Sequence, residues 1–87
     1  MYLFTWDENK NALNKKNHGV SFEESETVFY DENHSDNEDR FRILGYSDNG
    51  NLLLVVHCIR DEFVIRIISA RKATETEKQN YVRSLNL

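Results

Sequence analysis

The fold is decided by residues 52–69, which read LLLVVHCIRDEFVIRIIS. Residues 52–59 are almost continuously apolar, which is typical of a central strand covered on both faces. Residues 60–62 are charged and predict a tight turn, and residues 63–69, rich in Val and Ile, predict a second central strand. Two neighbouring strands with so short a connection form an antiparallel pair.

A third strand is predicted immediately before this pair. Residues 40–46 combine aromatic and branched side chains, and residues 47–51 contain Asn49-Gly50, a dipeptide that tolerates positive φ and favours a hairpin turn. The three strands therefore form an antiparallel meander. Residues 31–39 contain no apolar side chain and are expected to be a loop.

The N-terminal part predicts one strand and two helices. Residues 2–6 alternate and are rich in aromatics, so they indicate a short strand. Asp7 can cap a helix over residues 8–16, and Gly19 can end it.

Two capping boxes mark the starts of further helices. In the first, the Ser21 hydroxyl is expected to accept the Glu24 amide while the Glu24 carboxylate reaches back to the Ser21 amide, opening a helix to about Tyr30. Thr74 and Glu77 form the second box, which opens a last helix towards the C-terminus.

The expected order is thus β-α-α-β-β-β-α. This order predicts an α+β fold, an antiparallel sheet with the helices packed on one face. The first strand should lie at an edge or beside a central strand. The 87 residues are enough for one domain, residues 1–87.

Composition narrows the class of protein. Apolar residues make up 39% of the chain, which suits a folded domain. Cys58 is the only cysteine, so we expect a reducing cytoplasmic location and no cysteine-rich zinc site. The N-terminus does not resemble a signal peptide, and the longest apolar run, residues 52–56, is too short to span a membrane.

Charge is distributed unevenly along the chain. Residues 1–39 carry three lysines against ten acids, a net −7, and residues 40–87 carry eight basic residues against five acids, a net +3, which together give −4. A basic half can contact phosphate even in an acidic protein. The acidic half is a candidate partner surface, although a solvated face explains it equally simply.

Basic residues of the predicted sheet are the first candidates for chemistry. Arg66 interrupts an apolar strand, so its guanidinium must face solvent, a partner, or an acid such as Glu62 or Glu38. Arg71 and Lys72 stand where a strand gives way to a helix, a position that can favour phosphate or be a plain linker.

Arg40 and Arg42 share one face of their predicted strand, because side chains two residues apart point the same way. They could continue a basic surface begun by Arg66, or they could simply line the outer face of an edge strand.

The histidines and one tyrosine are weaker candidates. His18 at a helix end and His34 in a polar loop have ordinary structural explanations, and the spacing of the histidines matches no metal motif. His57 is expected to be a satisfied core residue, or else a general base if the strand register places it beside Arg66. Tyr81 has the helical spacing of a core residue, although a site position is also open.

Several motifs together resemble a known family, the BrnT toxins of bacterial type II toxin–antitoxin systems. The resemblance covers residues 4–83. Its motifs are residues 4–14 (FTWDENKNALN), 16–24 (KNHGVSFEE), 28–31 (VFYD), 38–40 (EDR), 44–45 (LG) and 66–73 (RIISARKA), with Glu77 and Tyr81.

The resemblance implies a RelE-like fold and metal-independent endoribonuclease activity, with no cofactor. In that chemistry the ribose 2′-hydroxyl attacks the adjacent phosphate, and arginine suits the stabilisation of the transition state. The roles it suggests are charge stabilisation by Arg40, Arg66 and Arg71, substrate binding by Lys72 and Arg42, and proton transfer by His57 or Tyr81.

The resemblance also implies a partner. This would be a BrnA-like antitoxin of ribbon-helix-helix type, which binds operator DNA while the toxin reaches that DNA only through it; a homodimer or a heterotetramer with the antitoxin would be the assembly. Two alternatives stay open: a catalytically inactive module that regulates through the partner, and a plain interaction domain whose arginines are scattered and individually paired.

Overall fold

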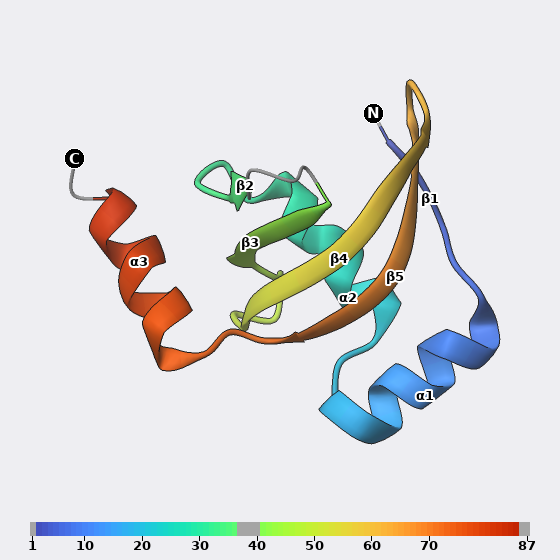
Figure 1. The fold of residues 1–87 in the computed structure, drawn as a ribbon, viewed down its shortest axis with the longest axis horizontal. Helices are drawn as coiled ribbons and strands as arrows, with labels where there is room; N and C mark the ends of the chain where they lie inside the picture. The colour runs from blue at the N-terminus through green and yellow to red at the C-terminus, as the bar shows by residue number, and fades with distance from the viewer. Residues whose placement is uncertain (1, 37–40, 86–87) are drawn as a thin grey trace.

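A single five-stranded sheet organises the computed structural model, with strand order β1-β5-β4-β3-β2 (Figure 1). The structure describes residues 2–36 and 41–85, except for the side chain of Asp36. Its elements, in chain order, are β1 (Leu3–Thr5), α1 (Glu8–His18), α2 (Phe22–Glu26), the 3-10 helix η1 (Thr27–Tyr30), β2 (Ser35–Asp36), β3 (Arg42–Tyr46), β4 (Leu52–Asp61), β5 (Val64–Lys72) and α3 (Glu75–Leu85).

The sheet confirms the predicted α+β class and meander. β3, β4 and β5 pair antiparallel in sequence order, and β1 pairs parallel with β5 at the edge of the sheet, where it was expected. The predicted loop differs at one place, because Ser35 and Asp36 form a short strand against β3. Such pairing uses only backbone groups, so the polar side chains gave no sign of it.

The first helix is capped as predicted and also seals the edge of the sheet. Asp7 accepts the amides of Asn9 and Lys10, and Gly19 ends the helix in the left-handed conformation, at φ 70°. The buried Asn14 side chain accepts the amide of Ala70 at 3.1 Å and donates to the carbonyl of Ala70 at 2.8 Å. β1 pairs with β5 only as far as Arg66, and at Ala70 the Asn14 side chain takes the place of a neighbouring strand.

The two capping boxes differ in the structure. At α3 both halves form, because Glu77 donates its amide to Thr74 and accepts the Thr74 amide on its carboxylate. At α2 only the Ser21 hydroxyl caps the helix, as predicted. The Glu24 carboxylate instead accepts two side chains of the β3–β4 turn, Ser47 at 2.6 Å and Asn51 at 2.8 Å, and so ties that turn to the helix.

The sheet buries a different cluster on each face. The larger lies under α1, α2 and η1 and consists of Val20, Phe22, Val28, Ile43, Leu53, Val55, Ile67 and Ala70. The smaller lies under α3 and consists of Leu44, Leu52, Leu54 and Tyr81. Since neighbouring residues of β4 belong to different clusters, α3 covers the opposite face from α1 and α2.

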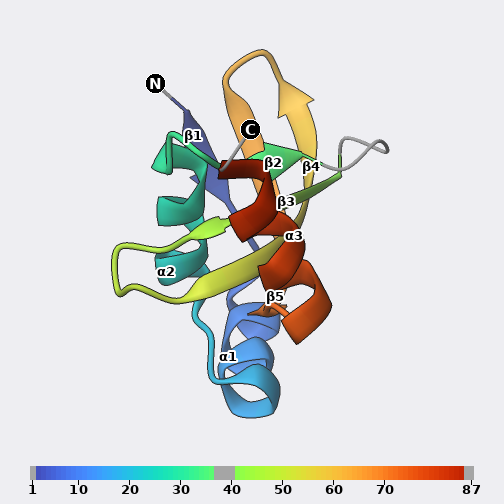
Figure 2. The ribbon, with the colours of Figure 1, turned by 90° about the vertical axis from the view of Figure 1, so that its left-hand side faces the viewer.

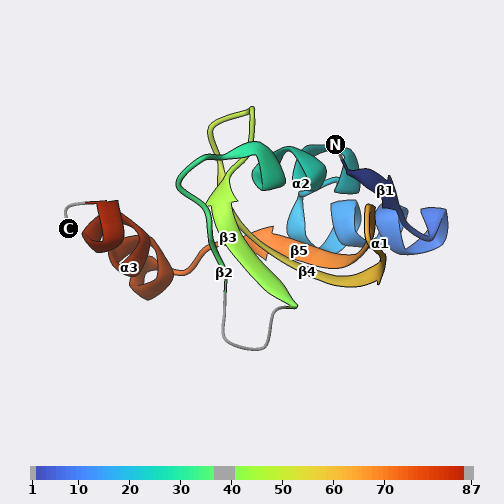
Figure 3. The ribbon, with the colours of Figure 1, turned by 90° about the horizontal axis from the view of Figure 1, so that it is seen from above.

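The position of α3 differs from the predicted arrangement with all helices on one face. In Figure 3, α3 stands apart from α1 and α2 at the other end of the molecule. The reason is that the first half of β4 is apolar on both faces, and each of these faces needs a cover. In the part of the chain that the structure describes, no helix is long and apolar enough to cross a membrane.

Candidate functional site

Three arginines project from the sheet face that α3 partly covers. Arg42 lies on β3, and Arg66 and Arg71 lie on β5. Their cross-strand partners on β4 are alternate residues, Val56, Cys58 and Leu54 respectively. Alternate residues of a strand share a face, so the three arginines do too. We call this surface the arginine face.

The three arginines of the arginine face are spread over a patch and do not converge on one position. Arg66 and Arg71 lie opposite β4 residues four positions apart, which is about 13 Å along the strand at about 3.3 Å per residue. Arg42 is two strands away from Arg66, or about 10 Å across the sheet. A patch of this extent suits several phosphates of one nucleic-acid strand better than a single anion.

Arg66 is the arginine whose side chain is least committed. It is half-buried, and no described residue forms an ion pair or hydrogen bond with its guanidinium. Of the two acids considered as partners, Glu62 lines a pocket on the other face, and Glu38 lies outside the described residues. The hydrogen-bond donors of Arg66 are therefore available to a ligand or to water.

Arg71 is held by an acid of α3. Its two terminal nitrogens donate to the Glu77 carboxylate at 2.8 and 3.0 Å, a bidentate pair. These hydrogen bonds lower the pKa of Glu77 to about 2 and raise the pKa of Arg71 above its usual range. The pair joins the end of β5 to α3, so Arg71 has a structural role whatever else it binds.

The remaining basic candidates lie at the margins. Arg42 is exposed at the start of β3. Lys72 pairs with Leu53, which places it off the arginine face, at the end of the sheet beside the β3–β4 turn. Arg40 lies outside the described residues.

His57 lies on the opposite face from Arg66. It pairs with Ile67, and its neighbour Cys58 pairs with Arg66. The imidazole is buried against the ring of Phe29, with ring centres 4.9 Å apart. The register thus rules out the hypothesis of a His57 base beside Arg66 and agrees with the core interpretation of this histidine.

Tyr81 is also a buried structural residue. Its ring packs edge-on against Tyr46, and its hydroxyl donates to Asp31 at 2.7 Å. Burial, followed by the Asp31 hydrogen bond, raises the pKa of Tyr81 well above its usual range. A phenol this reluctant to ionise is a poor general base at neutral pH.

Asp31 links α3 to strand β3, a role that was not predicted from the sequence. Its carboxylate accepts both the Tyr81 hydroxyl and the Tyr46 amide, which lies 2.7 Å away. Burial alone would raise its pKa, but these hydrogen bonds outweigh burial and lower it. The signal available in the sequence was only its place in the 28–31 motif, which says nothing about a contact 50 residues away.

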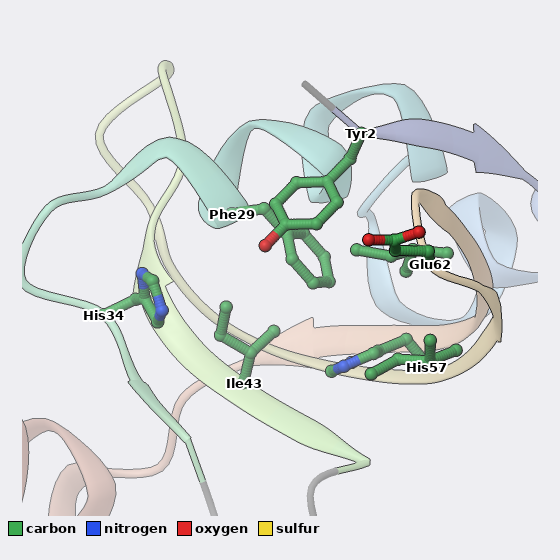
Figure 4. Close-up of a pocket in the computed structure, with 8 residues that line it drawn as sticks. Tyr2, Phe29, His34, Ile43, His57 and Glu62 are labelled. Atoms are coloured by element: carbon green, nitrogen blue, oxygen red, sulfur yellow. The ribbon is translucent and has the colours of Figure 1, made fainter.

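A pocket of about 390 Å³ opens on the face opposite the arginines, near the β4–β5 turn (Figure 4). We call it the hairpin pocket. In Figure 4 the Tyr2 ring lies over the hollow and His57 lies at its floor. Its lining consists of Tyr2, Phe29, His34, Ile43, His57, Ile59, Glu62 and Ile65. Within the described residues, no group of three or more His, Cys, Asp or Glu side chains could hold a metal ion.

Comparison with known proteins agrees with this architecture. The crystal structure of the Brucella abortus ribonuclease toxin BrnT covers 86% of this chain and 100% of its own, with 20% sequence identity and a TM-score of 0.64. At that identity the likeness establishes the fold, a small α+β toxin fold. No curated protein sequence matches this one.

The family is established by sequence. Residues 6–77 match the family described as the ribonuclease toxin BrnT of type II toxin–antitoxin systems. The chain belongs to this family of ribonuclease toxins. The resemblance drawn from the motifs is thereby confirmed, and membership of a type II system implies an antitoxin partner.

Proposed function

We propose that this toxin cleaves RNA at the arginine face, without a metal ion. The 2′-hydroxyl would lose its proton to solvent as its oxygen attacks the adjacent phosphorus, and the bond from phosphorus to the 5′-oxygen would break as that oxygen takes up a proton from solvent. The products would be a 2′,3′-cyclic phosphate and a 5′-hydroxyl end. Negative charge on the phosphate oxygens grows during this step, and a positioned guanidinium stabilises it.

The observation that carries the proposal is the guanidinium of Arg66, which pairs with no acid among the described residues and shares a face with Arg42 and Arg71. Because Arg66 is half-buried and not committed to a described acid, its guanidinium is open to a phosphate. Arg66 would stabilise the transition state, while Arg42 and Arg71 would hold flanking phosphates. Lys72, which lies off this face, is not assigned a phosphate, and Arg40, outside the described residues, remains a predicted contact.

Proton transfer is not assigned to either residue first considered. His57 faces away from Arg66, and the Tyr81 hydroxyl is committed to Asp31. Glu77, with its pKa lowered to about 2, holds no proton to donate at neutral pH. The proposal therefore assigns most of the rate enhancement to orientation of the 2′-hydroxyl and to charge stabilisation.

The antitoxin would be a BrnA-like protein of ribbon-helix-helix type, and the pair would act in the cytoplasm. This part of the proposal is supported by the family and by the single cysteine. The complex would reach operator DNA through the antitoxin alone.

An inactive binding module is the second candidate function. It is favoured by the ion pair of Arg71 with Glu77 and by the position of His57 on the face opposite the arginines. It predicts that the wild-type toxin binds its antitoxin and leaves RNA intact.

The deciding experiment is RNA cleavage by the purified wild type and by Arg66→Ala, in buffer containing a chelator. Loss of one positioned donor to the transition state lowers the rate by about 10²–10³-fold. Arg66→Lys, which keeps the charge but not the planar fork, should recover only part of this loss.

Arg83→Ala is the matched control, because Arg83 is exposed on α3. It should cleave like the wild type. If Arg66→Ala cleaves as fast as Arg83→Ala, the arginine face is not the site; if the chelator abolishes cleavage, the reaction needs a metal.

A further inference from the structure

Exposed apolar side chains gather around the mouth of the hairpin pocket. Tyr2 and Ile59, which line the pocket, are 45% and 61% exposed. They come from two segments at this end of the sheet, since Tyr2 precedes β1 and Ile59 lies near the end of β4, and the Leu3 amide holds β1 to the β4–β5 turn by donating to the Phe63 carbonyl at 2.7 Å. Single exposed apolar residues are ordinary, but a group around a pocket marks an interaction site.

The location leaves this group open to a partner. Figure 2 shows the β4–β5 hairpin extending beyond the helices at the top of the molecule, with β1 beside it. The helices that cover the larger core therefore leave the outer end of the same face uncovered. The pocket is a continuation of the core that no segment in the described part of the chain fills.

The charge of the pocket distinguishes between a nucleic acid and a protein. Glu62 is the charged carboxylate in its lining, and no lysine or arginine belongs to that lining. An RNA strand needs cations against its phosphates. Arg42, Arg66 and Arg71 lie on the opposite, arginine face.

We infer that the hairpin pocket is the docking site of the antitoxin polypeptide. The antitoxin would insert one bulky apolar side chain between Tyr2 and Ile59 and place a lysine or arginine beside Glu62. A buried apolar residue flanked by a complementary charge is the usual composition of an interface hot spot. The inference rests on the proposed function only in requiring a protein antitoxin.

This placement has a functional consequence. The antitoxin contacts one face of the sheet, and the proposed RNA site occupies the other. Substitutions in the pocket therefore reduce neutralisation without reducing cleavage. The acidic character of residues 1–39, which supply Tyr2, is then a property of the antitoxin-facing half.

The test measures binding of the purified antitoxin encoded in the same operon to the full-length toxin, by calorimetry. Ile59→Asp puts a carboxylate at the pocket mouth and should weaken binding by about tenfold or more. Tyr2→Ala removes the ring over the pocket from a position outside the regular strand, and should weaken binding by a similar factor.

Leu13→Asp is the matched control. Leu13 is as exposed as Ile59 but lies on α1, away from the pocket, so its substitution should leave antitoxin binding unchanged. Circular dichroism of each variant reports whether it is folded. RNA cleavage by the free Ile59→Asp toxin should equal that of the wild type.

Two outcomes would overturn the inference, and a third would overturn only the proposed function. Antitoxin binding that is equal for wild type, Ile59→Asp and Tyr2→Ala removes the pocket from the interface. Slower RNA cleavage with unchanged antitoxin binding would make the pocket an RNA subsite instead. Failure of the wild type to cleave RNA would refute the proposed function while leaving the binding comparison valid.

Discussion

The two faces of the sheet are made by the same strands and yet are built differently. One face carries α1, α2 and η1 over eight buried cluster residues, among them Phe22, Leu53 and Val55. The other carries α3 over a cluster of four. The first face is the stable core of the molecule. The second leaves room for charged side chains such as Arg66.

The difference shows how a small domain accommodates exposed cations in a central sheet. α3 contributes one buried residue, Tyr81, and is further held by the Arg71–Glu77 pair and the Tyr81–Asp31 hydrogen bond. Polar contacts thus supplement the apolar packing of Tyr81 in holding this helix. The face that α3 covers only in part is therefore the face that can present arginines to a ligand.

The largest loss of stability is expected for Asn14→Ala, on the sheet face that α1 and α2 cover. Asn14→Ala would leave the Ala70 amide and the carbonyls of Ala70 and Val20 without their buried partner. We expect a loss of about 2–4 kcal/mol in the free energy of unfolding, measured by urea denaturation. Asn17→Ala, on the exposed side of the same helix, should change it little. Equal effects would mean that Asn14 does not seal the β5 edge.

An intermediate effect is expected at the pair that holds α3. Glu77→Gln keeps the shape of the side chain and removes its charge, and should cost about 1–2 kcal/mol at neutral pH, because solvent screens this partly exposed pair.

The pH dependence of the same variant follows from the pKa of Glu77. Folding lowers that pKa from 4.5 to about 2, so the stabilisation is present above pH 4.5 and is lost as the pH falls towards 2. Urea midpoints of wild type and Glu77→Gln should therefore converge at low pH. A gap that stays constant over this range would show that the charge pair contributes nothing.

The smallest effect is expected for Tyr81→Phe. The ring remains buried and only the hydrogen bond to Asp31 is lost, which should cost about 1 kcal/mol. The pKa of Asp31, followed by NMR titration, should rise, since one of the hydrogen bonds that lower it is gone. Tyr30→Phe is the control, because Tyr30 is exposed. An unchanged Asp31 pKa would contradict a hydrogen bond between Tyr81 and Asp31.

Much of the fold could be predicted because its signals are local. The apolar run of β4, the Asn49-Gly50 turn and the caps at Asp7 and Thr74 each act within a few residues of themselves. The short strand β2 and the contacts of Glu24 with the β3–β4 turn were missed. Both depend on segments that meet only after the chain has folded.

The candidate site was predictable only in part, for the same reason. Arg66 was marked by its charge inside an apolar strand, and that signal is local. Whether His57 stands beside it depends on the register of two strands, where a shift of one residue exchanges the faces. A bulge between Val56 and His57 adds an irregularity that no local pattern announces.

By itself, the amino-acid sequence determined the class of fold, the order of its elements and the family, because apolar periodicity, capping residues and motifs are written along the chain. Only the tertiary structure decided that the arginines share one face, that His57 faces the other, and that Tyr81 and Arg71 hold α3. Side-chain neighbours across a sheet are set by register and packing, and these arise between segments distant in sequence.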